Sequence, residues 1–240
     1  MPLRMDRRGR VAVLTLDDPE RRNALSAEMV DQIVETVTAC EADADVGALV
    51  ITGAAPAFCS GADVSALGEM SGRDAGEVRS IYDGFLSVRS CNLPTVAAVN
   101  GPAVGAGFNL ALCCDVRISA TSARFDARFA RIGLHPGGGH VWMLERAVGP
   151  QAAAAISLFG ERVEGPRAAE LGLVWRCVAD DDLLEDAVAL AANAAELAPD
   201  LAAALKTTLR EAPWHADFEA AVRVELTRQR KTFEQGGGAS

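Results

Sequence analysis

Apolar and polar positions follow one another along this chain in two patterns, one typical of strands and one typical of helices. Short apolar runs bounded by polar or glycine residues predict strands, which we expect over 11–16, 48–52, 93–101 and 115–120. Apolar residues spaced three or four positions apart predict helices after Ser26, which is a suitable N-cap, over 73–90 and over 105–114.

The order of these elements predicts the fold class. Strands and helices alternate through the first part of the chain, which favours an α/β fold with a mostly parallel sheet and right-handed connections. Beyond Asp182 the pattern is helical, with one apolar stripe from Leu183 and two further helices over 200–212 and 217–233. We therefore expect a core over 1–180, a helical C-terminal region over 181–235 and a disordered tail over 236–240.

Charge and cysteine usage narrow the possible partners. The 240 residues carry a net charge of -10, which argues against nucleic acid or an anionic membrane as a partner because both would repel the protein. The 6 cysteines form neither a CxxC pair nor a cluster at metal spacing, so we expect buried thiols in a reducing compartment and no metal site. No apolar leader precedes the first strand, so we expect a cytoplasmic protein.

Two segments rich in small residues each follow a predicted strand. They are "FCSGAD" at 58–63 and "GPAVGAGF" at 101–108, and ligands of α/β sheets gather at the carboxyl ends of strands. Without bulky side chains, backbone N–H groups can approach a ligand oxygen, and the second segment also opens a helix whose first amides are unpaired. Such N–H groups could form an oxyanion hole. The alternative is that the small residues only allow close helix packing.

Five segments of the chain resemble the enoyl-CoA hydratase (crotonase) superfamily in their order and spacing. The resemblance implies a crotonase-like β-β-α spiral core with a helical C-terminal trimerisation region, and hence a homotrimer or a dimer of trimers. It implies acyl-CoA thioesters as ligands and no covalently bound cofactor. The matching segments are "DDPERRNALS", "LVITGAAPAFCSGADVSAL", "NLPTVAAVNGPAVGAGFNLALCCDVRISA", "ARFDARFARIGLHPGG" and "GERVEGPRAAELGLVWRCV".

The same resemblance assigns candidate binding residues. The two backbone N–H groups that would hold the thioester oxygen fall on Ala62, within "GAD", and on Ala106, within "GAG". The positions expected to contact coenzyme A are Arg22, Ala24, Ala62 and Asp63. Exposed arginines are more often solvated surface charges, which is the alternative interpretation of Arg22.

The chain departs from the family where hydratases of this group place two glutamates. The first position holds Asn109 and the second holds Phe129. An amide cannot act as a general base and a phenyl ring cannot transfer a proton, so two-carboxylate hydration is disfavoured. The segment "GLHPGGGH" contains His135 and His140, of which the first aligns just before the turn beside the acyl pocket.

Other groups near the expected site could replace the glutamates. Candidate bases are His135, Tyr82 and a bound water, although a histidine that anchors the turn and a tyrosine that packs in the core are the alternatives. Cys59 and Cys114 fit packing better than nucleophilic catalysis. Two functions remain open: an enzyme of the hydratase/isomerase group that stabilises a thioester enolate, and a non-catalytic acyl-CoA-binding or carrier protein.

Overall fold

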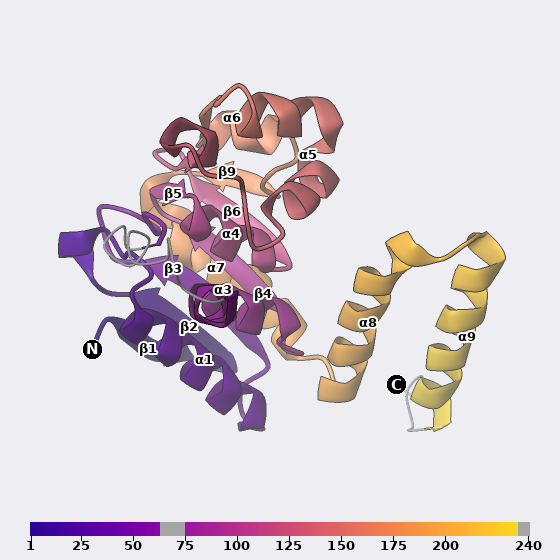
Figure 1. Ribbon diagram of the computed structural model, residues 1–240. Helices are drawn as coiled ribbons and strands as arrows, with labels where there is room; N and C mark the ends of the chain where they lie inside the picture. Colours follow the sequence, from indigo (N-terminus) through magenta and orange to yellow (C-terminus); the bar gives the residue numbers. More distant parts are fainter. Residues whose placement is uncertain (63–74, 235–240) are drawn as a thin grey trace.

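Buried parallel strands form the centre of the computed structural model, which describes residues 1–62 and 75–234 (Figure 1). The main sheet has the order β1-β2-β3-β4-β6-β9. Only β1 is antiparallel to its neighbour, so within the described residues the predicted mostly parallel sheet is confirmed. The strands are β1 (Leu3–Arg8), β2 (Val11–Leu16), β3 (Ala48–Gly53), β4 (Thr95–Val99), β6 (Val116–Ala120) and β9 (Arg176–Val178).

A second, smaller sheet continues the spiral beyond the main sheet. It has the order β5-β7-β8 and consists of β5 (Pro102–Val104), β7 (Arg124–Asp126) and β8 (Val163–Glu164). The segment after β3 joins it, because Cys59 pairs with Ala103 of β5 in an isolated parallel bridge. Residues 58–62 are thereby held beside the start of the helix that follows β5.

Helices cover the main sheet. Helices α1 (Ala27–Ala42) and α3 (Ala75–Ser90) pack together in front of the sheet, and α7 (Leu183–Ala195) packs against β2, β3, β4 and β6 behind it (Figure 1). Ser26 caps α1 as predicted, since its hydroxyl accepts a hydrogen bond from Met29 N at 3.2 Å. The other helices that the structure describes in the body are α4 (Ala106–Cys113), α5 (His140–Ser157) and α6 (Gly165–Glu170), with 3-10 turns η1 (Pro19–Arg21), η2 (Phe129–Ile132) and η3 (Asp180–Asp182).

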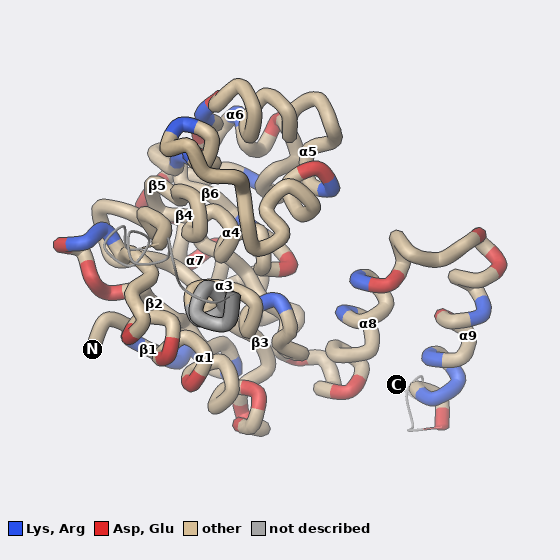
Figure 2. The backbone as a smooth tube through the Cα atoms, viewed as in Figure 1, with Lys and Arg blue, Asp and Glu red and all other residues tan. Residues whose placement is uncertain are grey.

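The last two helices stand away from the sheet as an antiparallel pair (Figure 1). They are α8 (Pro199–Glu211) and α9 (Phe218–Glu234), joined through η4 (Ala212–Trp214). Lys206, buried on α8, fastens the pair to the body through Asp115 Oδ2 at 2.7 Å and Leu93 O at 2.6 Å. Figure 2 shows basic and acidic residues distributed along both helices.

The hydropathy of the helices bears on whether any of them could cross a membrane. Among the described residues, no single helix is both long and apolar enough to cross a membrane. The segments Asp180–Ala195 and Pro199–Trp214 reach that length and apolar character only when they are taken together, and they are bent by 108° relative to each other.

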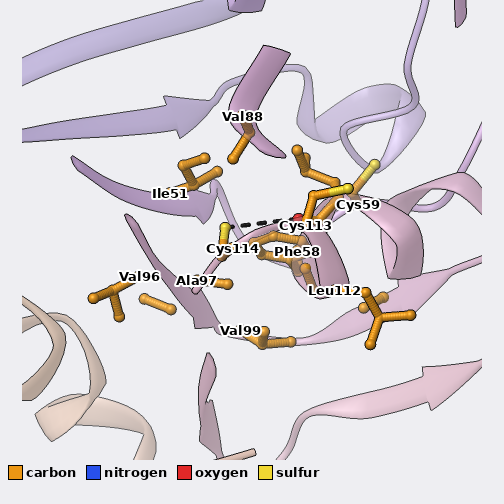
Figure 3. Close-up of a cluster of buried hydrophobic side chains, with 14 of the residues drawn as sticks. Ile51, Phe58, Cys59, Val88, Val96, Ala97, Val99, Leu112, Cys113 and Cys114 are labelled. Carbon is orange, nitrogen blue, oxygen red and sulfur yellow. Dashed lines mark hydrogen bonds between the residues drawn. The ribbon is translucent and has the colours of Figure 1, made fainter. Parts of the chain in front are cut away.

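The cysteines belong to the packed interior. Figure 3 shows Cys59, Cys113 and Cys114 among apolar side chains, including Phe58 and Val99. All 6 cysteines are free thiols, and the 5 that are fully buried confirm the prediction that they act as small apolar residues. Burial raises the pKa of Cys59 to about 12 and raises that of Cys114 as well, so neither thiol is a nucleophile at neutral pH.

Candidate active site

The two segments rich in small residues lie against each other at the carboxyl ends of the strands. Cys59 N donates to Pro102 O at 3.1 Å, and Val104 N donates to Cys59 O at 2.9 Å. A Cβ atom on Gly61 would lie 2.8 Å from Val104 O and 3.6 Å from Ala106 N, so the Gly61 backbone lies beside the first residue of α4. Residues 58–62 and the start of α4 thus form one shared backbone surface.

Helix α4 begins in a way that leaves its first amides unpaired. Gly105 precedes it with φ 52° and ψ -115° and supplies no side-chain cap, so the first-turn N–H groups, including that of Ala106, have no partner within the helix. Gly107 packs so closely that a Cβ there would overlap Cys59 O. Close packing and access to backbone N–H groups therefore occur together here.

Asn109 is buried with both ends of its amide engaged. Its Nδ2 donates to Gly137 O at 3.0 Å, and its Oδ1 lies 2.8 Å from His140 Nδ1. A carbonyl oxygen only accepts hydrogen bonds, so the Asn109 NH2 group must face Gly137 and its oxygen must accept from His140. The proton of a neutral His140 is thereby fixed on Nδ1, and Nε2 carries a lone pair.

His140 is the first residue of α5 and is 1% exposed. Its ring meets Phe108 edge-on, with centroids 5.3 Å apart, and meets Phe129 in the same manner at 5.1 Å. Nε2 has no hydrogen-bond partner among the described residues. Burial lowers the pKa of His140 to about 4, so the imidazole is neutral at physiological pH.

Phe129 closes the cluster on the side of α4. Two of its ring carbons lie 3.9 Å from where a Cβ of Gly105 would be, and its ring also contacts that of His140. The structure therefore brings together the two positions that the resemblance assigns to the family's glutamates, and it places His140 between them. We call Asn109, Phe129 and His140 the histidine cluster. Sequence reasoning named His140 without giving it a role, although it directly follows the glycine turn.

Tyr82 and His135, the two side chains predicted from the sequence as candidate bases, lie in different surroundings. Tyr82 on α3 packs against Phe85, and its hydroxyl lies so close to Gly137 that a Cβ there would overlap it. It is therefore next to the turn that holds Asn109. His135 is exposed, with Nδ1 2.7 Å from the adjacent Pro136 O, and the structure does not bring it into the histidine cluster.

The segment expected at the coenzyme A end lies beside residues 58–62. Ser60 N donates to Arg22 O at 3.0 Å, and Leu25 N donates to Gly61 O at 2.8 Å. Arg22 is exposed in the left-handed region with φ 52°, and Ala24 is buried. Asp63 lies outside the described residues. Within those residues, no group of His, Cys, Asp and Glu side chains is arranged to hold a metal ion.

Asn23 fixes this segment and was not singled out from the sequence. It is completely buried, and its Nδ2 donates to Ala54 O at 2.8 Å and Ala57 O at 2.7 Å, while its Oδ1 accepts from Asp18 N at 3.0 Å. The amide therefore ties together the loops that surround the site.

Comparison with known proteins matches the sequence of this chain to one family. The model of the enoyl-CoA hydratase/isomerase family covers residues 6–237. The probable enoyl-CoA hydratase EchA14 of Mycobacterium tuberculosis is 50% identical over 231 residues, which span 93% of this chain and 89% of that protein. The 2,3-dehydroadipyl-CoA hydratase of Escherichia coli is 36% identical over 231 residues, spanning 95% and 88% of the two chains.

A solved structure agrees with this match. The enoyl-CoA hydratase from Polaromonas sp. JS666 superposes with a TM-score of 0.90 at 31% identity, covering 99% of this chain and 93% of that one. The predicted crotonase-like fold is thereby confirmed. The chain belongs to the enoyl-CoA hydratase/isomerase family, whose members act on coenzyme A thioesters, and is an enzyme of lyase or isomerase type.

Proposed function

We propose that the protein binds an acyl-CoA thioester and stabilises its enolate in an oxyanion hole made by the N–H groups of Ala62 and Ala106. The convergence of residues 58–62 with the unpaired first turn of α4 is the observation that carries the proposal. Two backbone donors and the positive end of a helix dipole favour negative charge on the thioester oxygen.

The residues around this hole favour proton transfer over hydration. Hydration by two carboxylates requires a water held and deprotonated between them, and Phe129 can do neither. Asn109 has both amide ends engaged with Gly137 and His140, so its polar atoms are committed to the protein. The reaction class that we propose is removal and return of a proton next to the thioester carbonyl.

Coenzyme A would extend past the segment around Arg22 and Ala24. This segment lies against residues 58–62, which hold Ala62, and Asp63 follows directly in the chain. Because the chain carries a net charge of -10, the phosphates need local cations, which the adjacent arginine supplies.

We further propose that the protein assembles as a homotrimer or a dimer of trimers in the cytoplasm. Supporting this, α8, η4 and α9 expose large apolar side chains, and α8 and α9 stand away from the sheet, so self-association would bury apolar surface. These side chains are Leu205, Leu209, Trp214, Phe218, Val222, Leu226 and Phe233.

The proposed function is tested at Ala106. Ala106→Pro deletes the N–H at the first helical position, where proline is tolerated in helices. We expect a loss of about 10²–10³-fold in the exchange of α-protons of butyryl-CoA with D2O. Ala106→Gly keeps the N–H and removes only the methyl group, so it should exchange protons at about the wild-type rate. Equal losses in both variants would contradict an oxyanion role for this amide.

An assay of enoyl absorbance separates the remaining functions. Hydration of crotonyl-CoA or longer enoyl-CoAs at about 1–10³ per second would contradict the proposed reaction class. Binding of these thioesters without exchange, isomerisation or hydration would instead favour the non-catalytic carrier function, which the replacement of both glutamates by Asn109 and Phe129 motivates.

A further inference from the structure

The histidine cluster contains one buried polar atom that accepts or donates no hydrogen bond among the described residues. Nε2 of His140 has no partner among the described residues, although the side chain is 1% exposed. An unpaired buried nitrogen costs free energy of folding, so its retention needs a reason beyond packing.

We propose that Nε2 of His140 is the base that removes the α-proton of the bound thioester, with Asn109 as its positioning residue. This inference rests on the proposed function, because it supplies the acid/base group that the enolate site requires. One imidazole would thus stand in for the pair of carboxylates.

The position of His140 supports this role. Its ring contacts both Asn109 and Phe129, the two positions at which the resemblance places the family's acid and base. Both also lie close to the proposed oxyanion hole, because Phe129 packs against Gly105 and Asn109 N donates to Gly105 O at 3.1 Å. A group between them is placed next to the start of α4, where the thioester carbonyl would be held.

The hydrogen bonds prepare His140 in the form that a base requires. Asn109 accepts from Nδ1, which leaves the lone pair on Nε2. Asn109 is in turn oriented by Gly137 O at 3.0 Å, so the imidazole cannot turn over without breaking this chain of hydrogen bonds. An asparagine that holds a catalytic imidazole in one tautomer contacts the ring through its amide oxygen, as Asn109 contacts His140.

The surroundings set the proton affinity of this base. Burial lowers the pKa of His140 to about 4, which is close to that of an ordinary carboxyl group. Helix α4 presents Phe108 and Asn109 to the ring and η2 presents Phe129, none of which titrates. Helix α3 places the titratable Tyr82 beside Gly137, while the charged residues Glu145 and Arg146 that follow on α5 are exposed.

The proposed step conserves charge within the site. Nε2 takes the proton from the α-carbon, and the electron pair of that C–H bond becomes the double bond of the enolate, whose negative charge rests on the thioester oxygen. The imidazolium and the enolate form an ion pair in an apolar site, where their attraction is strong. If the proton on Nε2 is replaced by a solvent deuteron before reprotonation, delivery of that deuteron to the α-carbon gives exchange. In a 3-enoyl chain, delivery of the proton to the γ-carbon instead moves the double bond.

The test is α-proton exchange of butyryl-CoA in D2O, followed by NMR. We expect exchange with the wild-type protein and a loss of about 10²–10⁴-fold in His140→Gln, with unchanged affinity for butyryl-CoA by calorimetry. His215→Gln, in the connection between α8 and α9, is the matched control and should exchange at the wild-type rate.

The outcomes separate the two proposals. Exchange by His140→Gln at the wild-type rate would overturn the role of His140 and leave the oxyanion hole standing. If the wild-type protein binds butyryl-CoA but exchanges no protons, the proposed function fails and this inference fails with it. If His140→Gln does not fold, the ¹⁵N resonance of His140 Nε2 in the wild-type protein decides, since an Nε2 signal that butyryl-CoA leaves unchanged overturns the proposal.

Asn109 is tested through the pH profile of exchange. Asn109→Asp places a carboxylate next to Nδ1, which raises the pKa of His140 and moves the acid limb of the profile to higher pH. A purely structural Asn109 would change the stability of the protein and leave this limb where it is in the wild type.

Discussion

Acid should destabilise this protein through His140, and the size of the effect follows from its burial. The pKa of this imidazole falls from an ordinary 6.5 to about 4 because the folded protein shields it from water. Above pH 6.5 the ring is neutral in the folded and the unfolded chain, so it does not alter stability. Below that pH the unfolded chain binds a proton that the folded protein does not, and the free energy of unfolding decreases.

The magnitude follows from this difference in pKa. One pKa unit corresponds to about 1.4 kcal/mol, so the complete loss, reached once the pH falls below about 4, is about 3 kcal/mol. Between about pH 7.5 and about pH 5 the loss amounts to about 2 kcal/mol. That is a substantial part of the free energy of unfolding of a typical folded domain, which is about 5–15 kcal/mol.

Urea denaturation of wild type and His140→Gln at these two pH values measures the effect. Protein concentration must be constant, because an oligomer is stabilised by mass action. We expect the wild type to lose about 2 kcal/mol more than the variant on acidification, since other titrating groups contribute equally to both. The control His215→Gln should follow the wild type. Parallel pH dependences of wild type and His140→Gln would refute the argument that burial suppresses protonation.

Two further predictions concern contacts that shape the site and its attachment. Gly137→Ala places a Cβ against the Tyr82 hydroxyl and should cost about 1–3 kcal/mol in urea denaturation, whereas adding Tyr82→Phe should recover most of that loss; purely additive effects would contradict the contact. Asp115→Ala leaves the buried Lys206 ammonium with Leu93 O as its remaining hydrogen-bond acceptor and should lower the free energy of unfolding by about 3 kcal/mol. Lys206→Met removes the charge itself and should lower it by less, and the reverse order would contradict a buried ion pair.

The elements predicted from periodicity are the ones that bury side chains. Strand β2 occurs over Val11–Leu16 as expected, and Ser26 caps α1, because an apolar run and a cap are local features of sequence. Strand β1 was not predicted, since in Leu3–Arg8 only the first residue is buried. Backbone pairing with the edge of β2 makes it a strand, and that pairing leaves no side-chain pattern to detect.

Helix α5 was also missed, for a different reason. Gly149, with φ 77° and ψ 168°, interrupts the helix and Pro150 follows, so the apolar spacing does not continue through it. The three-residue strands β5 and β7 are too short to show any alternation. The division of the chain at 180/181 stays a prediction, with α7 packed against the sheet and α8 and α9 away from it. The tail at 236–240 lies outside the described residues.

Parts of the site could be predicted from the sequence, and the identity of the buried histidine could not. The convergence of residues 58–62 with the start of α4 follows from strand order, and the replacement of two glutamates follows from alignment of motifs. The choice between His135 and His140 does not, because it depends on consecutive left-handed residues, Gly138 with φ 64° and Gly139 with φ 79°. That turn leaves His135 exposed and points His140 inward.

The two hydrogen bonds of Asn109 also bear on how this protein could be converted to a two-carboxylate hydratase. A glutamate at position 109 has only acceptor oxygens, and so does the carbonyl of Gly137 that now receives the amide NH2. Replacing Asn109 and Phe129 by glutamate would therefore set a carboxylate against a carbonyl and would remove the tie that holds the glycine turn in place. The double variant Asn109→Glu with Phe129→Glu therefore has to be followed in the position of the turn at Gly137 as well as in activity, because the turn would lose its hydrogen bond to the residue 109 side chain.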